Sequence, residues 1–189
     1  MGSNVNLAPG QVATALVEVA HVGGIVATYC DHTEHNEPAG ADTLRAAAGR
    51  LRSVAEFLAD ELRLDLQEAY ANRLAQLERR SLLGPLLPSP ADDVRRARSL
   101  RDLQLAQLRH DRHYHPDVFG LTKRDQLIHV AIHLSKLTAA VATLTEGDSR
   151  SWLEFSQRRL PDLLLFGVKL STLAGEILPS ESTISRRRL

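Results

Sequence analysis

The sequence predicts an all-α protein, and two observations carry this prediction. Apolar residues recur at helical spacing over long stretches, and no stretch shows the strict alternation of a half-buried strand. The β-branched residues also fall at helical spacing, while Pro and Gly gather in short segments between the apolar stretches. We therefore expect a helical bundle of about six helices.

The first half of the chain is expected to contain three helices. Residues 11–30 are apolar on most sides, which is typical of a helix buried in a bundle. Asp42 is placed to cap a second helix whose leucines and alanines form a continuous seam. Residues 66–80 form the third helix. Residues 31–40 are expected to be a loop.

The second half begins after a connector. Residues 81–90 contain three prolines and a glycine, so we expect a non-helical segment whose leucines lie against the core. Asp92 and Asp93 then open one long charged helix that runs to about residue 112. Residues 149–178 are predicted to be helical, with Pro161 either bending the helix or starting a new one.

These patterns give one domain with short ends. The expected organisation is a flexible lead over residues 1–10, a single all-α domain over 11–178, and a flexible basic tail over 179–189. The domain divides into halves 11–80 and 91–178, which resemble each other weakly: residues 21–27 align with 133–139, and 50–53 with 159–162. Two related helical hairpins would pack as one bundle.

Composition limits the classes of function. The 189 residues carry 23 Lys plus Arg and 23 Asp plus Glu, so no net charge favours nucleic acid. Only 4% of residues are aromatic, which leaves little for base stacking on an open surface. The single cysteine, Cys30, fits a reducing compartment, and no apolar run is expected to span a membrane. We therefore expect a cytoplasmic protein with no membrane association.

Histidines gather in residues 110–144, which hold five of the eight in the chain. Thr122 is placed to cap the helix that follows, with Asp125 in its first turn. On this helix His129, His133 and Lys136 share one stripe that apolar positions flank on both sides. A polar stripe of this kind is expected inside a bundle or a cleft, so any functional site should lie here.

Four segments together have the pattern of a known family. Residues 100–115 with Pro116 form a leading helix and a His-Pro turn, and the helix of residues 127–137 follows. Residues 159–166 have the position of a later helix with a paired acidic motif, and residues 65–80 are similar to a tail helix. This pattern resembles that of the MazG-like all-α nucleotide pyrophosphohydrolases.

In that family carboxylates hold Mg²⁺, which bridges the phosphates and positions a water molecule. Of the positions that align with those carboxylates only Asp162 is acidic here, the others being His21, Gly24, Arg50, Ser53, His133, Lys136 and Arg159. The resemblance therefore implies a nucleotide-directed protein with a diverged site, which either hydrolyses its ligand or binds a nucleotide or phosphate without hydrolysis. Asp162 and His133 are its candidate catalytic residues, and Mg²⁺ or Mn²⁺ is the expected cofactor if the family activity persists.

The same residues allow other interpretations. His129 and His133, one turn apart, with Asp162, could hold Zn²⁺ or another transition metal in a hydrolase. Alternatively Lys136, Arg159 and Arg112 could bind the phosphates of a nucleotide directly.

Two further interpretations do not depend on the histidine stripe as a nucleotide site. The spacing of Arg109 and His115 is similar to a motif of HEPN ribonucleases, which are also all-α. The other alternative is a non-catalytic scaffold or homodimer built by the long apolar helices. A buried polar stripe distinguishes the nucleotide-directed protein from the scaffold, because a scaffold has no need of one.

Overall fold

The computed structural model describes residues 7–35, 37, 40–146 and 149–175. Within these ranges the chain consists of helices and the turns between them, with no strand, so the all-α prediction is confirmed. Most of the expected lead, residues 1–6, and the whole expected tail, residues 179–189, lie outside the described residues.

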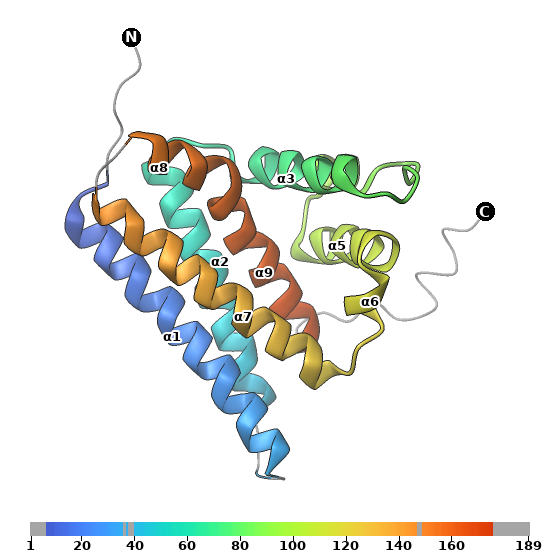
Figure 1. Ribbon diagram of the computed structural model, residues 1–189, viewed down its shortest axis with the longest axis horizontal. Coiled ribbons are helices and arrows are strands. Elements are labelled where there is room, and N and C mark those ends of the chain that lie inside the picture. The colour runs from blue at the N-terminus through green and yellow to red at the C-terminus, as the bar shows by residue number, and fades with distance from the viewer. Residues whose placement is uncertain (1–6, 36, 38–39, 147–148, 176–189) are drawn as a thin grey trace.

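Four helices form the main bundle: α1 (Pro9–Glu34), α2 (Ala41–Glu61), α7 (Lys123–Ala142) and α9 (Leu160–Leu173). In Figure 1, α1 lies along α7, and α2 lies along α9 behind them. Their shared core is aliphatic and includes Val22, Leu51, Leu134 and Leu163, all fully buried. Nearly all of α9 is buried, which makes it the central helix of the fold.

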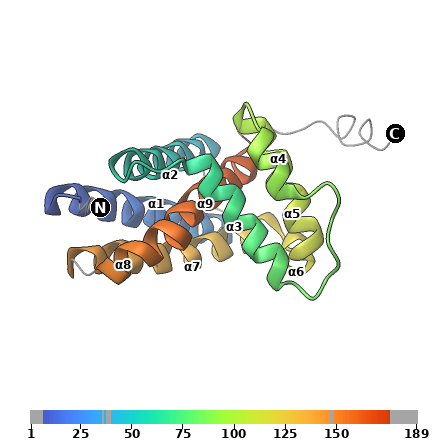
Figure 2. The same cartoon turned by 90° about the horizontal axis from the view of Figure 1, so that it is seen from above.

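A second layer crosses one end of this bundle. It consists of α3 (Leu66–Arg80), α4 (Pro90–Arg96), α5 (Leu100–Tyr114) and the short α6 (Pro116–Phe119). Figure 2 shows α4, α5 and α6 on the opposite side of α3 from α1 and α2. Both α3 and α5 contact α9, so the interface between the layers runs along this helix.

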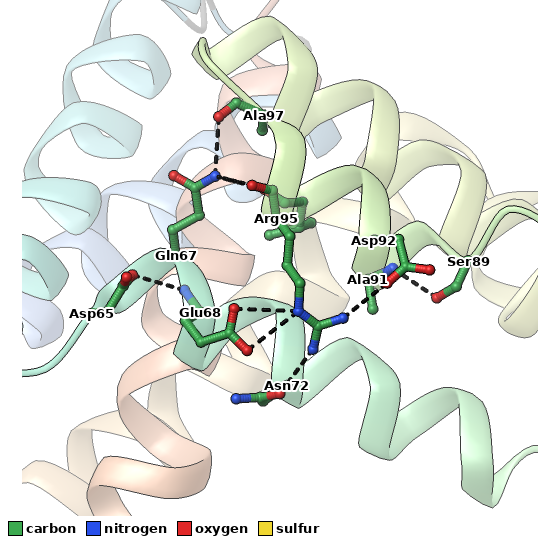
Figure 3. Close-up of polar contacts among 10 residues, drawn as sticks. Asp65, Gln67, Glu68, Asn72, Ser89, Ala91, Asp92, Arg95 and Ala97 are labelled. Atoms are coloured by element: carbon green, nitrogen blue, oxygen red, sulfur yellow. Dashed lines mark hydrogen bonds and ion pairs between the residues drawn. The ribbon is translucent and has the colours of Figure 1, made fainter.

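Polar contacts hold the second layer together (Figure 3). The Arg95 guanidinium on α4 lies between Glu68 and Asn72 of α3, 3.2 Å from Glu68 Oε2 and 2.9 Å from Asn72 Oδ1. Gln67 Nε2 donates to the carbonyl oxygen of Ala97 at 3.0 Å, which fixes the end of α4. Arg109 of α5 pairs with Asp93 of α4. These contacts join α3, α4 and α5 into one unit.

The return from α7 to α9 contains an irregular helix. After η1 (Thr143–Glu146) and α8 (Ser149–Glu154), the chain adopts a π-helical segment, η2 (Phe155–Arg159), before α9 begins. Pro161 lies in the first turn of α9, where its missing N–H costs nothing. Of the two alternatives for Pro161, the structure shows the start of a new helix.

The helix boundaries differ from the sequence expectation in three places. The long charged helix expected to end near residue 112 divides at Ala97, and Ser99 caps α5 by accepting from Asp102 N at 3.2 Å. This division raises the number of helices above six in the described ranges. The α1 helix continues to Glu34 through the start of the expected loop, and α2 has Gly40 at its N-cap with Asp42 in the first turn.

The expectation for the connector was half right. Residues 81–89 are non-helical, as predicted. Three of their four leucines do not lie against the core, however: Leu82 is 103%, Leu83 46% and Leu87 82% exposed, while Leu86 is half-buried.

Two helices are relevant to the expectation that no segment of the chain spans a membrane. On length and composition alone α1 and the segment Lys123–Thr145 could each span a membrane, contrary to that expectation. A buried core helix or a signal sequence also meets this criterion. The cytoplasmic location stays a prediction.

Candidate functional site

A cavity of about 150 Å³ lies between the bundle and the second layer. Side chains from α3, α5, α7 and α9 line it, together with His115 and Val118 at the α5–α6 turn. Its polar lining consists of Arg73, Gln107, His110, Asp111, His115, His129, His133, Asp162 and Lys169. A smaller chamber of about 40 Å³ adjoins it and has mainly apolar walls, including Phe119 and Val130.

A buried ion pair closes the α3 side of the cavity. Arg73 Nε donates to Asp162 Oδ1 at 2.7 Å, and Arg73 Nη2 donates to Asp162 Oδ2 at 3.2 Å. The two side chains are 13% and 9% exposed. Burial raises the pKa of Asp162 above its ordinary value, and the guanidinium of Arg73 opposes this shift. Both carboxylate oxygens are therefore already occupied by Arg73.

A second pair joins α5 to α9. Lys169 Nζ lies 3.0 Å from Asp111 Oδ1, and Gln107 Nε2 donates to the same oxygen at 2.8 Å. The Tyr70 hydroxyl in turn donates to Gln107 Oε1. Burial alone would raise the pKa of Asp111, but Lys169 and the His110 ring outweigh it and hold that pKa below its ordinary value. The network fixes Asp111 as an anion.

His110 and Gln107 are the most buried polar side chains that face the cavity. The His110 side chain is only 1% exposed. Its Nδ1 lies 3.5 Å from Asp111 Oδ1, and neither ring nitrogen has a hydrogen-bond partner among the described residues. Arg73 Nη1 is likewise buried without a partner there. Three nitrogen atoms of the lining therefore lack the partners that buried polar groups normally have.

The predicted stripe on α7 forms another wall. Thr122 caps this helix as expected, since its Oγ1 accepts from Asp125 N at 3.2 Å. The His129 and His133 rings are 4.6 Å apart, and His133 stacks on Phe166 of α9 at 4.5 Å with 25° between the planes. The three rings form one aromatic cluster, in which the His129 ring is tilted by 48° to the His133 ring.

The imidazoles that line the cavity share a shift in pKa. Burial lowers the pKa of His115, His129 and His133, and nearby cations lower it further. The effect is largest for His133, whose pKa falls to about 4 under the influence of burial, His129 and Lys136. These three imidazoles are therefore neutral at pH 7.

Farther along the same face of α7 lies an open groove against α8 and η2. It has a volume of about 360 Å³, and Lys136 and Arg159 line it with Ser151 and Glu154. Lys136 has no ion pair or hydrogen bond in the part of the chain that the structure describes, and Arg159 Nη2 lies 3.6 Å from Glu154 Oε1. Because Lys136 follows His133 by one turn, the groove continues the line of the cavity.

The structure brings together only some of the residues that the sequence singled out. His129, His133 and Asp162 line the cavity, while Lys136 and Arg159 line the adjoining groove. Arg112 lies apart from both, with its guanidinium 5.1 Å from the Phe119 ring centroid.

The residues of the HEPN-like motif have separate surroundings. Arg109 pairs with Asp93 and donates to the Pro88 carbonyl at 2.7 Å. His115 instead faces the cavity.

The metal interpretation depends on the donor atoms. In the described ranges no three His, Cys, Asp or Glu side chains are grouped so as to hold a metal ion. Asp162 is engaged by Arg73 and Asp111 by Lys169, and the remaining ligands are imidazoles. Mg²⁺ prefers free oxygen ligands, so these residues do not fit the ion that the family resemblance implies.

Sequence reasoning missed Arg73, His110, Asp111 and Lys169. Two of them could have been found from the sequence. Lys169 is the one Lys or Arg within the apolar helix α9. His110 shares a face of α5 with Gln107 and Tyr114. A lone cation in a buried helix needs a partner, and a polar stripe on a buried face indicates a polar interior. Which partner each group meets depends on how the helices cross.

Comparison of the chain with family models, with curated proteins and with solved structures finds no match.

Proposed function

We propose that this protein binds a nucleotide along the line formed by the cavity and the groove, and that it does so without a metal-dependent hydrolytic step. The proposal combines two neighbouring sites of different character. The cavity has a mixed lining with nine polar side chains, and the groove is more open and carries two cations. A nucleotide has the same two parts, a polar ring system and a phosphate group.

The observation that carries the proposal is the set of buried nitrogen atoms without partners. Leaving a buried polar group unsatisfied costs about 1–3 kcal/mol. His110 contributes two such atoms and Arg73 one, all at a single cavity. A bound ligand that supplies their partners offsets this cost.

The cations of the groove supply the phosphate contacts. Lys136 and Arg159 come from different helices and line the same space. Arg159 is 37% exposed and its contact with Glu154 is long, so its guanidinium can turn to a phosphate. Lys136 is exposed and needs no existing pair to be broken.

The chemistry of the residues that line the cavity argues against a metal-dependent hydrolytic step. A pyrophosphohydrolase-type reaction needs carboxylate oxygens free to bind Mg²⁺. The carboxylates of the cavity, Asp111 and Asp162, each face a cation at hydrogen-bond distance. In this proposal Asp162 and His133 therefore position the site rather than carry out hydrolysis.

The likeness to MazG-like proteins belongs to this proposal as well. The packing of α1 on α7 and of α2 on α9 supports two related hairpins, α1–α2 and α7–α9, facing each other. A Cβ added at Gly23 of α1 would lie 3.7 Å from Leu134 Cβ of α7, close to the aligned segments of the two halves.

A second candidate function is supported by the outer surface of the bundle. Val17 of α1 is 64% exposed and Ile132 of α7 is 52% exposed, on helices that are apolar on most sides. Helices of this kind are usually covered on all sides. This favours a scaffold that forms homodimers, which sedimentation of the purified chain would test.

The test of nucleotide binding is a titration followed by calorimetry and by thermal unfolding. The ligands are nucleoside mono- and triphosphates, each with EDTA and with Mg²⁺. We expect binding in EDTA and no release of pyrophosphate with Mg²⁺. Binding should weaken about tenfold in Lys136→Met, through loss of one charge-assisted contact, and stay unchanged in the matched variant Lys123→Met at the other end of α7.

Absence of binding by every nucleotide would contradict the proposal, and a dimer without any ligand would then favour the scaffold. Equal weakening by both lysine variants would place the phosphate elsewhere.

A further inference from the structure

We propose that the cavity takes a single six-membered polar ring of the pyrimidine class, with His110 and Arg73 contacting its edge and the phosphate held outside at Lys136 and Arg159. This inference rests on the proposed function and adds the ligand class and its orientation. Size, charge, polar atoms and wall shape each support it.

The volume limits the size of the occupant. The cavity measures about 150 Å³. A cavity of this size engineered into another protein binds benzene, a single six-membered ring. A whole nucleotide does not fit in this space, and a bicyclic purine is larger than the ring for which it has room. The adjoining chamber adds only about 40 Å³.

The charges in the cavity favour a neutral occupant. Its cations, Arg73 and Lys169, each face a carboxylate, Asp162 and Asp111 respectively. The imidazoles of His115, His129 and His133 have lowered pKa values and add no charge at neutral pH. A phosphate dianion buried here would lack a free countercharge, whereas the groove outside offers Lys136 and Arg159.

The unpartnered atoms suit the edge of such a ring. A neutral imidazole has one donor and one acceptor nitrogen, and a guanidinium nitrogen is a donor only. Arg73 Nη1 is therefore a donor, and the His110 ring presents two nitrogens without partners. Pyrimidine bases carry carbonyl acceptors next to a ring nitrogen or an amino group, so their edge can contact both side chains.

The walls suit a planar ring. His133 and Phe166 stack on each other and both line the cavity, together with the aliphatic side chains of Val118 and Leu165. Aromatic rings prefer offset stacking against another ring, which favours a flat occupant over a tetrahedral one.

The experiment compares the parts of the ligand. The full chain is titrated by calorimetry with uridine, cytidine, adenosine, guanosine, ribose 5-phosphate and inorganic phosphate. We expect uridine or cytidine to bind at least about tenfold more tightly than either purine nucleoside and than ribose 5-phosphate. Tighter binding of purine nucleosides, or of phosphate alone, overturns the inference while leaving nucleotide binding intact.

A variant separates recognition from folding. In His110→Leu we expect pyrimidine nucleoside binding to fall about tenfold and the melting temperature to stay the same or rise, because an unsatisfied buried group is removed. In Lys136→Met nucleoside binding should be unchanged while binding of uridine monophosphate weakens. Undiminished nucleoside binding by His110→Leu contradicts the assigned role of His110.

If no nucleoside and no nucleotide binds, the proposed function itself fails. If nucleotides bind and nucleosides do not, only the orientation proposed here fails.

Discussion

The side chains of Arg73 and Asp162 illustrate how much a single residue depends on its partner in this protein. Both are nearly buried and they share two hydrogen bonds. The sequence singled out Asp162 as an isolated acid near a histidine stripe. It could not show that Arg73, on another helix and far away in the chain, takes both of its oxygens.

This pair gives the first prediction. Asp162→Asn leaves a buried guanidinium without its counterion, and we expect the free energy of unfolding to fall by about 3–5 kcal/mol. The double variant Arg73→Met/Asp162→Leu should lose much less, because no charge is left buried. Urea denaturation measures both.

A matched control is available on the surface. Arg50 and Glu18 lie 3.2 Å apart and are 50% and 35% exposed. Arg50→Met should therefore cost about 1 kcal/mol or less. If Asp162→Asn lowered the free energy of unfolding by no more than Arg50→Met does, the buried pair would be unimportant for stability.

The cavity histidines give the second prediction, on pH. The folded protein keeps His115, His129 and His133 neutral, whereas the unfolded chain protonates its histidines near pH 6.5. The unfolded state therefore binds more protons as the pH falls from about 6.5 toward 4. Stability should be complete above pH 6.5 and decrease through that range, as followed by the melting temperature.

Since the pKa of His133 is lowered to about 4, His133→Gln should reduce this pH dependence. His35→Gln, at a side chain that is 59% exposed, is the control and should leave it unchanged. A melting temperature that is constant between pH 7 and 4.5 would contradict the prediction.

At the scale of helices, the close approach of α2 and α9 gives the third prediction. A Cβ at Gly167 would lie 2.8 Å from Arg52 Cγ and 3.4 Å from Arg52 N. Gly167→Ala therefore overpacks the interface, and we expect a loss of about 1–3 kcal/mol in unfolding free energy.

Gly24 of α1 provides the matched control, because a Cβ there meets nothing within 4 Å. Gly24→Ala should stabilise the helix by about 1 kcal/mol or less. Equal effects of the two substitutions in thermal or urea unfolding would refute the close approach at Gly167.

Helices were predicted well where periodicity was strong and poorly where a short break decides the boundary. Residues 66–80 form α3 as expected, and Thr122 caps α7 as expected. The break between α4 and α5 was missed, because Ser99 is one cap signal within a continuous charged stretch. The π-helical turn of η2 has no sequence pattern of its own.

At the scale of the whole molecule, the site depends on two layers. The α7 and α9 walls belong to the bundle, and the α3 and α5 walls belong to the second layer. The sequence predicted the α7 wall from the stripe of His129, His133 and Lys136. It could not predict the layer that faces this wall, because that depends on how α3 and α5 cross α9.

This arrangement gives the fourth prediction. A ligand in the cavity contacts both layers and binds only the folded protein, so at a concentration of 100 times its Kd it should add about 2.7 kcal/mol of stability. For a chain of this size each kcal/mol raises the melting temperature by about 2–4 °C. Hydrogen exchange should slow in both α5 and α7, and slowing confined to one layer would contradict a shared site.

The most direct measurement is the imidazole ¹⁵N NMR spectrum of the full chain during titration with uridine monophosphate. The proposed site predicts saturable shifts for the ring nitrogens of His110, His129 and His133, with no change at the exposed His21 and His35. Unchanged resonances for the three cavity histidines, at concentrations where the nucleotide binds, would show that the cavity is not the site.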